Sequence, residues 1–353
     1  MPLPPEIILH QPEWLEEASP CNHVVVTSRA RFARNLDNHP FSPHAPSPIL
    51  ARVHGAIQEA LARNPYFEDF FRLELATTSG LDRAFLKESR LISKEMERGG
   101  ESRAVYIRAD LKCSVMVNEE DHLRLQCFEA GLQTNKAQER LRQLDAEVAR
   151  VLAYARSDRF GYLTACPSNM GTGLRISVMM HLPGLTLRRE LEEALKGLPS
   201  RGLTVRGFYG ENSENIGDFF QISNEVTLGK PVDAIEENLA SAVGTIMEKE
   251  LEARSLLHRE GGLAVLDSIW RSYGILTSAR RMDSMEAMKL LSRLRLGVDE
   301  GFFPGISHGR LNRLIVEIQP GHLILRRGAT DETEQRDFSR AALLREYLAE
   351  AAQ

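Results

Sequence analysis

The sequence predicts a protein in two parts, a first part that mixes strands with helices and a second part that is mostly helical. Up to about residue 255, short runs rich in β-branched and aromatic residues alternate with segments whose apolar residues recur every three or four positions. Beyond residue 256 only the helical spacing continues. A chain of 353 residues suits two domains, which we expect to cover residues 1–255 and 256–353.

Individual elements follow from the same patterns. Strands are predicted over residues 24–28, 105–109, 114–117, 123–127, 176–181 and 219–228. Helices are predicted around residues 141–151, 235–246, 287–294 and 341–348. Asp233 and Glu236 have the spacing of a capping box and predict where the second of these helices begins. Residues 95–102 and 328–335 are polar and predict loops.

The composition excludes several classes of protein. The formal net charge is −5, and the chain has no basic tail, which argues against a nucleic-acid partner. No apolar stretch approaches the roughly 18–20 residues of a membrane span, and the first residues lack the features of a signal peptide, so we expect a cytoplasmic protein. Four cysteines without a CxxC pair or a nearby histidine predict free thiols, not a zinc site or a disulfide framework.

Arginine is unusually frequent among the basic residues, with 36 arginines against eight lysines. Genome base composition can produce such a bias. A functional explanation is that the planar guanidinium group binds phosphate oxygens through two hydrogen bonds at once. The positions of the arginines must decide between these explanations.

Two arginines lie close together at the end of the first predicted strand. Arg29 and Arg31 are two residues apart in the segment VVVTSRARFARN, so in an extended chain both side chains point to one face of the sheet. Two adjacent guanidinium groups repel each other unless an anion lies between them. The alternative is that both are solvated or paired with carboxylates.

An acidic cluster follows the third predicted strand, in the segment SVMVNEEDHLRLQC. If this segment stays extended, Glu120 and Arg124 share a face and lie roughly 13 Å apart. The neighbouring Glu119 and Asp121 add negative charge that a nearby cation would relieve. This pattern fits a site for a metal nucleotide or a cationic substrate, and equally an acidic surface turn.

Two glycine-containing turns carry further charged residues. In TACPSNMGTGLR, Cys166 precedes two glycines and Arg175, and glycines of this kind allow a backbone to approach a ligand closely. In VRGFYGENSE, Arg206 and Glu211 flank another such turn. Cys166 taken alone is more typical of inert packing.

The familiar nucleotide and hydrolase motifs are absent from the sequence, including GxxxxGK[ST], GxGxxG after a strand, HExxH and GxSxG. The turns and strand ends instead present five arginines and two isolated glutamates. Five fixed cations suit a triphosphate, because catalysis of phosphoryl transfer consists mainly of positioning and charge stabilisation. Two carboxylates suit a cationic nucleophile.

Taken in order, the motifs SRAR, VNEEDHLR, CPSN with GTGLR, and RG with GE resemble those of the phosphagen (guanidino) kinase superfamily, and within it the protein-arginine kinases. The resemblance spans about residues 24–345. It implies an α+β fold with an antiparallel sheet flanked by helices, followed by a helical domain that forms a homodimer. It also implies that ATP is bound with Mg²⁺, and that no protein-held metal is needed.

The resemblance assigns roles to individual residues. It implies that ATP phosphates are bound by Arg29, Arg31, Arg124, Arg175 and Arg206. Glu120 and Glu211 are expected to hold the substrate guanidinium and act as base, with Cys166 beside it. The sequence departs from the family where SRLIS places Arg90 at the position of a histidine that lies against adenine. A guanidinium group also stacks on rings, so Arg90 remains a predicted nucleotide contact.

The acceptor is expected to be an arginine on a protein. Only 28 residues precede Arg29, where small-molecule members carry a sizeable helical domain, and RMDSMEAMKLLSRLRLGVDEG resembles the helical domain of protein-arginine kinases. The segment RDFSRA matches a family motif for phosphoarginine at an allosteric site, which implicates Arg336, Asp337 and Arg340. The alternative is a surface ion pair between Asp337 and Arg340.

The predicted function is therefore ATP-dependent phosphorylation of arginine side chains in proteins. The resemblance implies that the products are marked for a Clp-type protease, and an activator protein is a further possible partner. Two alternatives stay open at this point: a kinase of free arginine or another small guanidine, and a non-catalytic phosphoarginine reader that keeps the kinase fold.

Overall fold

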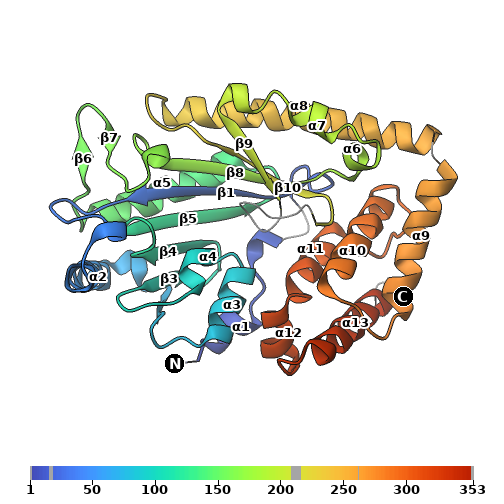
Figure 1. Cartoon of the computed structure of the whole chain (residues 1–353), viewed down its shortest axis with the longest axis horizontal. Coiled ribbons are helices and arrows are strands. Elements are labelled where there is room, and N and C mark those ends of the chain that lie inside the picture. Colours follow the sequence, from blue (N-terminus) through green and yellow to red (C-terminus); the bar gives the residue numbers. More distant parts are fainter. Residues whose placement is uncertain (1, 16–18, 208–215, 261, 351–353) are drawn as a thin grey trace.

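The computed structural model describes residues 2–15, 19–207, 216–260 and 262–350, and shows a twisted sheet covered by helices with a group of helices at one end (Figure 1). The strands of the main sheet are β1 (Val25–Arg34), β2 (Phe70–Glu74), β3 (Ala104–Arg108), β4 (Cys113–Val117), β5 (Leu123–Ala130), β8 (Leu174–His181), β9 (Leu203–Gly207) and β10 (Phe219–Asn224). They pair in the order β2-β3-β4-β5-β1-β8-β10-β9, and every pairing is antiparallel. A small hairpin of β6 (Arg156–Ser157) and β7 (Gly161–Tyr162) stands apart.

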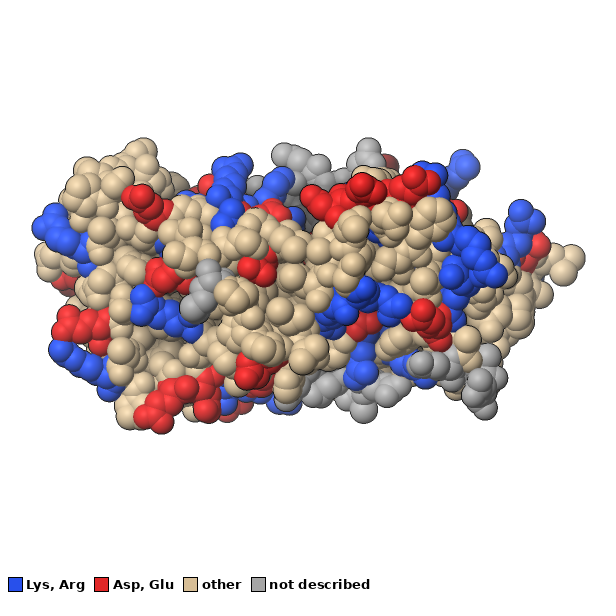
Figure 2. All heavy atoms as spheres, turned by 90° about the horizontal axis from the view of Figure 1, so that it is seen from below, with Lys and Arg blue, Asp and Glu red and all other residues tan. Residues whose placement is uncertain are grey.

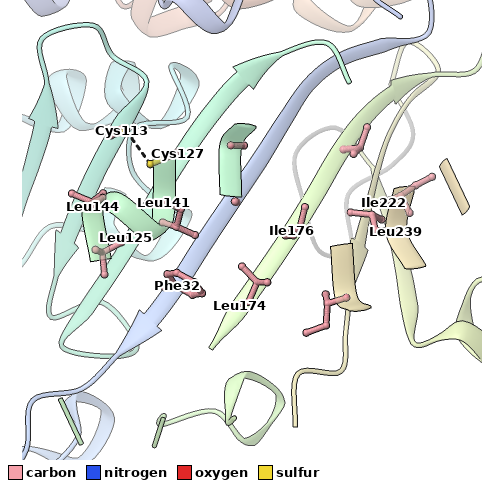
Figure 3. Packing of buried hydrophobic residues seen from close by; sticks show 14 of the residues in the cluster. Phe32, Cys113, Leu125, Cys127, Leu141, Leu144, Leu174, Ile176, Ile222 and Leu239 are labelled. Carbon is pink, nitrogen blue, oxygen red and sulfur yellow. Dashed lines mark hydrogen bonds between the residues drawn. The ribbon is translucent and has the colours of Figure 1, made fainter. Parts of the chain in front are cut away.

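One face of the main sheet carries the larger hydrophobic core. Two helices, α5 (Thr134–Ala149) and α8 (Val232–Glu260), pack against it. Figure 3 shows Phe32, Leu125 and Ile176 from the sheet lying with Leu141 and Leu239 from these helices. Burying a side chain of this size contributes roughly 1.5–3 kcal/mol. Because successive side chains of a strand point to opposite faces, the residues between these core positions point to the other face of the sheet.

Further helices surround the sheet and form the C-terminal part. Those in the first part are α1 (Pro5–Leu9), α2 (Ser47–Ala62), α3 (Gly80–Glu88), α4 (Lys94–Glu97), α6 (Pro183–Leu187) and α7 (Leu191–Leu195). The C-terminal part contains α9 (Gly262–Ser278), α10 (Ser284–Asp299), α11 (His308–Glu317), α12 (Pro320–Arg327) and α13 (Thr333–Glu350). Short 3-10 turns lie at η1 (Glu13–Leu15), η2 (Ser42–His44), η3 (Pro65–Phe67), η4 (Pro167–Asn169) and η5 (Pro199–Arg201).

All six predicted strands and all four predicted helices are present, with shifted ends. The strand predicted over 219–228 ends earlier because the side chain of Asn224 bonds Leu174 O and Ile176 N at 3.0 and 2.7 Å, in place of the backbone ladder. The predicted capping box is wrong: α8 begins at Val232, and Asp233 pairs with Arg142. The loop predicted over 95–102 is also partly wrong, since α4 extends to Glu97.

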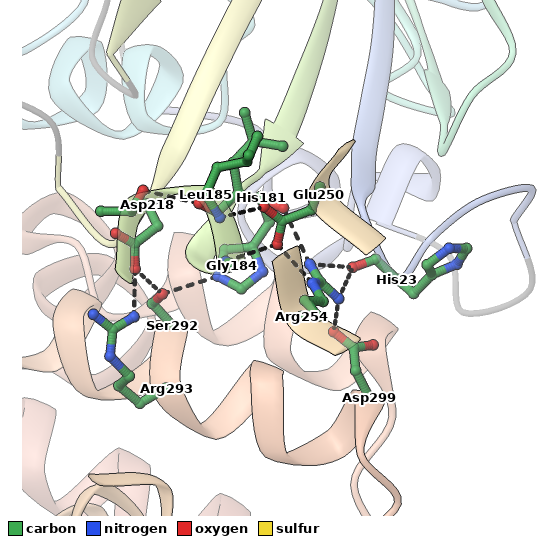
Figure 4. Close-up of polar contacts among 12 residues, drawn as sticks. His23, His181, Gly184, Leu185, Asp218, Glu250, Arg254, Ser292, Arg293 and Asp299 are labelled. Carbon is green, nitrogen blue, oxygen red and sulfur yellow. Dashed lines mark hydrogen bonds and ion pairs between the residues drawn. The ribbon is translucent and has the colours of Figure 1, made fainter. Parts of the chain in front are cut away.

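A buried polar network joins the sheet to the C-terminal helices (Figure 4). The guanidinium of Arg254 on α8 donates to Glu250 and to Asp299 of α10, both at 2.6 Å. Asp218, at the start of β10, accepts from Ser292 and Arg293 of α10 at 2.6 and 2.7 Å. Removing one member of such a network leaves a buried charge without its partner, which is strongly destabilising. The predicted division at 255/256 falls inside α8 and remains a prediction.

The surface mixes both signs of charge. On the face seen in Figure 2, basic and acidic side chains lie in small groups interspersed among uncharged residues. Over the described parts of the chain, no helix combines the length and the apolar character needed to cross a membrane. All four cysteines are free thiols, as predicted, and Cys113 and Cys127 face each other across β4 and β5 with 2.9 Å between their sulfurs.

Candidate active site

The register of the sheet brings five predicted arginines to one face, opposite the hydrophobic core. Residues directly opposite each other on antiparallel strands point to the same side. Arg31 of β1 lies opposite Arg175 of β8, and Arg124 of β5 lies opposite Ala33, two positions further along β1. Because Arg29 has the same parity as these residues, all four guanidinium groups leave the sheet on one side.

The fifth arginine reaches the same face through two intervening strands. Arg206 of β9 lies opposite Gln221 of β10, which lies opposite Met179 of β8. Met179 in turn lies opposite Thr27, two residues before Arg29. Four strands far apart in the sequence therefore present their arginines together.

These arginines line a cavity of about 1060 Å³. Its wall includes Arg29, Arg31, Arg90, Arg124, Arg175, Arg206, Glu120 and Cys166. All the predicted catalytic and nucleotide-contacting residues that lie within the described residues thus border one space. Glu211 lies outside the described residues.

The arginines in the cluster disfavour one another's charge. The pKa of Arg29 is held well below its ordinary value, first by burial and then by the positive charges of Arg124, Arg90, Arg175 and Arg206. Like charges in a poorly hydrated site disfavour the charged form. Arg29 also donates from Nε to Ser177 Oγ at 3.3 Å, and this bond orients its guanidinium group. The arrangement therefore favours binding of an anion with several negative charges.

The acidic cluster lies in the turn between β4 and β5. Of the two alternatives, an extended segment and a turn, the structure shows the turn: the chain reverses after Asn118, which has a left-handed φ of 54°. The turn separates the three carboxylates: Glu119 is buried against Arg124, and Asp121 is buried and accepts hydrogen bonds from other loops. Glu120 is exposed at the tip and borders the cavity.

Asp121 connects this turn to the loop that carries Cys166. Its Oδ1 accepts from Asn35 Nδ2 and from the backbone N–H of Ala165, both at 2.6 Å. Cys166 is half-buried, and its sulfur lies 3.0 Å from Ser168 Oγ. A single buried carboxylate therefore fixes the relative positions of Glu120 and Cys166.

The two glycines before Arg175 lie close to neighbouring chain segments, and Gly173 also borders the cavity, while approach of a ligand to them remains a prediction. A Cβ on Gly173 would lie 2.6 Å from Ala33 O, and one on Gly171 would lie 2.9 Å from the Cα of Leu228. Both residues also have positive φ, at 68° and 106°. The glycines therefore permit close approach of neighbouring chain segments, which orients the strand that carries Arg175.

Sequence reasoning missed part of the cavity wall. Ile315, Val316 and Gln319, at the end of α11, line the cavity beside the arginines. This helix was not among those predicted, and no local pattern describes which distant segment a helix packs against. The C-terminal part is thus a structural component of the site.

His122 is buried next to the acidic turn, and its titration should make the stability of the fold depend on pH. Its Nδ1 accepts from Leu36 N and its Nε2 donates to Pro40 O, both at 3.0 Å, which requires the neutral ring. Burial lowers its pKa to about 4. Because the unfolded histidine titrates near pH 6.5, the unfolded state binds more protons between these values. We expect His122 alone to reduce stability by about 2 kcal/mol between pH 7 and pH 5.

Urea unfolding at the two pH values measures this loss. His122→Gln cannot titrate and should show a smaller decrease than the unmodified protein. Both proteins contain the other buried histidines, so the difference between their losses of stability is due to His122. Identical pH dependence in the two proteins would contradict a neutral, buried His122.

The predicted phosphoarginine residues lie in α13, outside the wall of this cavity. Arg340 is buried and donates to Ile318 O at 2.8 Å, to Met282 O at 2.9 Å and to Asp337 at 2.7 Å. The pair of Asp337 and Arg340 is thus formed, but it is buried and not at the surface. Arg336 pairs with Asp331. Phosphoarginine binding by these residues remains a prediction.

Comparison with known proteins identifies the family. The model of the ATP:guanido phosphotransferase C-terminal catalytic domain matches residues 52–253, and that of the protein-arginine kinase McsB C-terminal domain matches residues 262–353. A protein-arginine kinase of Desulforamulus reducens is 43% identical over 340 residues, which cover 95% of each chain. The chain belongs to the protein-arginine kinase family. A family member from Symbiobacterium thermophilum is 42% identical over 95% of this chain and 96% of its own.

Solved structures of guanidino kinases share the fold. The duplicated taurocyamine kinase of Schistosoma mansoni aligns with a TM-score of 0.60 at 25% identity, over 67% of this chain and 34% of its own. A lombricine kinase aligns with a TM-score of 0.59 at 24% identity, over 69% and 71% of the two chains. The predicted family, the α+β fold with its helical C-terminal part and the phosphotransferase activity are confirmed. As a member of the ATP:guanido phosphotransferases, this kinase uses ATP.

Proposed function

We propose that this kinase transfers the γ-phosphoryl group of ATP to the guanidinium group of arginine side chains in proteins. The observation that carries the proposal is the convergence of the six predicted arginines and Glu120 on one cavity, in a chain whose relatives are protein-arginine kinases. Cations that repel one another gain stability when a triphosphate lies among them. A carboxylate beside them suits a cationic acceptor.

The arginines would bind and orient the phosphates. Arg29, Arg31, Arg124, Arg175 and Arg206 come from four strands of one sheet, so the backbone positions from which they reach the cavity are set before ATP binds. Preorganised donors of this kind stabilise charge that develops in the transition state without reorganising. Arg90 borders the same space from the segment that follows α3 and would complete the nucleotide contacts.

Glu120 would prepare the acceptor nitrogen. A guanidinium group has a pKa above 12 and no usable lone pair, so a proton must move to a carboxylate as the new bond forms. The nitrogen then bonds to the γ-phosphorus, the bond from that phosphorus to the bridging oxygen breaks, and ADP leaves with the electron pair. Family resemblance adds Glu211 as the second carboxylate and Cys166 as a neighbour of the guanidinium.

Mg²⁺ belongs to the proposal as an ion that arrives with ATP. Within residues 2–15, 19–207, 216–260 and 262–350, no group of three or more His, Cys, Asp or Glu side chains is arranged to hold a metal. The ion is expected to be bound mainly by phosphate oxygens and water, as Mg²⁺ commonly is in kinases. The ion would offset negative charge on the triphosphate.

Phosphorus NMR tests the reaction and its acceptor. We expect an acid-labile N–P signal on an unfolded protein incubated with the kinase, ATP and Mg²⁺, and none on the same protein with its arginines changed to lysine. A signal on free arginine alone would overturn the protein substrate and favour a small-molecule kinase. Phosphoarginine binding without any N–P signal would favour a non-catalytic reader.

Several further features belong to the proposal through family resemblance. They are a homodimer formed by the C-terminal part, a cytoplasmic location, an activator protein, and transfer of the products to a Clp-type protease. Binding of phosphoarginine at Arg336, Asp337 and Arg340 is proposed on the same basis, with Arg340 oriented by its bonds to Ile318 and Met282.

A further inference from the structure

A carboxylate from the first part of the chain caps a helix of the C-terminal part. Glu88, the last residue of α3, accepts from the backbone N–H groups of Gly321 and His322, in the first turn of α12, at 3.0 and 3.2 Å. The residue before α12, Gln319, makes no side-chain cap of its own. Glu88 therefore supplies the negative charge and the acceptors that the start of α12 requires.

Helices α3 and α12 pack closely against each other. A Cβ on Gly321 would lie 3.0 Å from the backbone nitrogen of Phe85 and 2.8 Å from Glu88 Oε2. The ring of His322 stacks on Phe85 with 4.1 Å between centroids. His322 is 1% exposed, so α12 is held against α3 through this ring.

His322 also fixes the residue that follows Glu88. Its Nδ1 lies 2.9 Å from Glu88 Oε2, and its Nε2 lies 3.2 Å from the hydroxyl of buried Ser89. Burial lowers the pKa of His322, which favours the neutral ring. The network then assigns Nδ1–H as donor to Glu88 and Nε2 as acceptor from Ser89. The His322 ring thus forms hydrogen bonds with two consecutive residues at the end of α3, Glu88 and Ser89.

The next residue, Arg90, is in a conformation that usually requires glycine. Its φ is 62°, and the N–H groups of Arg90 and Leu91 donate to Lys87 O and Leu86 O, both at 2.9 Å, which is the Schellman ending of a helix. Gln126 Nε2 donates to Arg90 O at 2.9 Å and ties the turn to the arginine face of the sheet. A strained residue of this kind persists only where its surroundings hold it.

We propose that Glu88 and His322 are positioning residues for Arg90, so that the C-terminal helices set the affinity of the cavity for nucleotide. Arg90 lines the cavity and lies near enough to Arg29 to depress its pKa. Glu88 itself borders the cavity, and so does Gln319, the residue before α12. The inference rests on the proposed binding of ATP in this cavity.

A double-mutant cycle with Arg90 tests the proposal. His322→Ala should weaken ATP binding about tenfold by calorimetry and raise the KM for ATP, while kcat at saturating ATP stays within about threefold of the unmodified enzyme. Arg90→Ala should weaken binding similarly. In Arg90→Ala, adding His322→Ala should cause no further loss, because the side chain that His322 positions is already gone.

Two variants separate positioning from general damage. Ser89→Ala removes one hydrogen bond only and should weaken ATP binding in the same direction if His322→Ala fails to fold. His308→Ala removes a different contact of the C-terminal part, with Asp299, and should lower the melting temperature with unchanged ATP affinity. Additive losses for His322 and Arg90, or unchanged affinity in Ser89→Ala and His322→Ala, would overturn the proposal. Failure of the proposed function is distinguished by absence of N–P product from the unmodified enzyme.

Discussion

Glu120→Gln is expected to reduce kcat for arginine phosphorylation by about 10²–10⁴-fold, the usual contribution of a positioned general base. The amide keeps the size of the side chain but cannot accept the proton that must leave the guanidinium group. Glu120 is exposed at the cavity and lies at the tip of a turn, so the change should leave the melting temperature almost unaltered. ATP affinity should be unchanged or slightly higher, because one negative charge near the triphosphate is removed.

Glu101→Gln is the matched control. Glu101 is also an exposed carboxylate in a turn, outside the cavity wall, and its replacement changes the net charge by the same amount. Rates are measured at saturating ATP with an unfolded protein as acceptor, and ATP binding is measured separately by calorimetry. If Glu120→Gln keeps more than about a tenth of the kcat, proton transfer to Glu120 is not part of the mechanism.

The fold was predictable where local periodicity is strong, and less so at the edges of the sheet. The central strands β4, β5 and β8 carry apolar residues at alternate or consecutive positions and are almost entirely buried, and each was located. The edge strands β2 and β9 were missed because each pairs on one side only and carries mixed polar and apolar residues. Their formation depends on a neighbour that is distant in the sequence, which no local pattern describes.

The site was predictable in its residues but not in its geometry. The two-residue spacing of Arg29 and Arg31 correctly indicates a shared face. Arg175 and Arg206 were selected from their glycine-containing turns, but their meeting with this pair depends on the register of four strands. The turn after Asn118 joins two strands that were predicted separately, but the alternation of apolar residues continues across it, so the sequence left an extended segment and an acidic turn as alternatives. Contacts of α12 with Glu88 depend on tertiary packing alone.

Arg29→Gln should have opposite effects on stability and on nucleotide binding. Without nucleotide, Arg29 is a partly buried cation whose pKa is lowered first by burial and then by the charges of four other arginines, so the folded state disfavours its charge. Without ATP, removing the charge of Arg29 should leave the melting temperature unchanged or raise it. With ATP, the same change removes a charge-assisted bond to phosphate, which is commonly about 1.5–3 kcal/mol, or roughly 10–100-fold in dissociation constant.

Thermal unfolding with and without ATP measures both effects in one experiment. The unmodified kinase should gain stability from ATP, and from sulfate to a lesser extent, because each anion relieves repulsion among the arginines. Arg29→Gln should start from an equal or higher melting temperature and gain little from ATP. Arg63→Gln removes an exposed arginine paired with Glu59 and should behave like the unmodified protein. A lower starting temperature together with an undiminished gain from ATP would mean that Arg29 supports the fold and not the nucleotide. The melting temperature of Arg29→Gln without ATP therefore shows whether Arg29 serves binding or the fold. A cation that serves binding destabilises the empty site, because only a bound anion offsets the repulsion among the arginines.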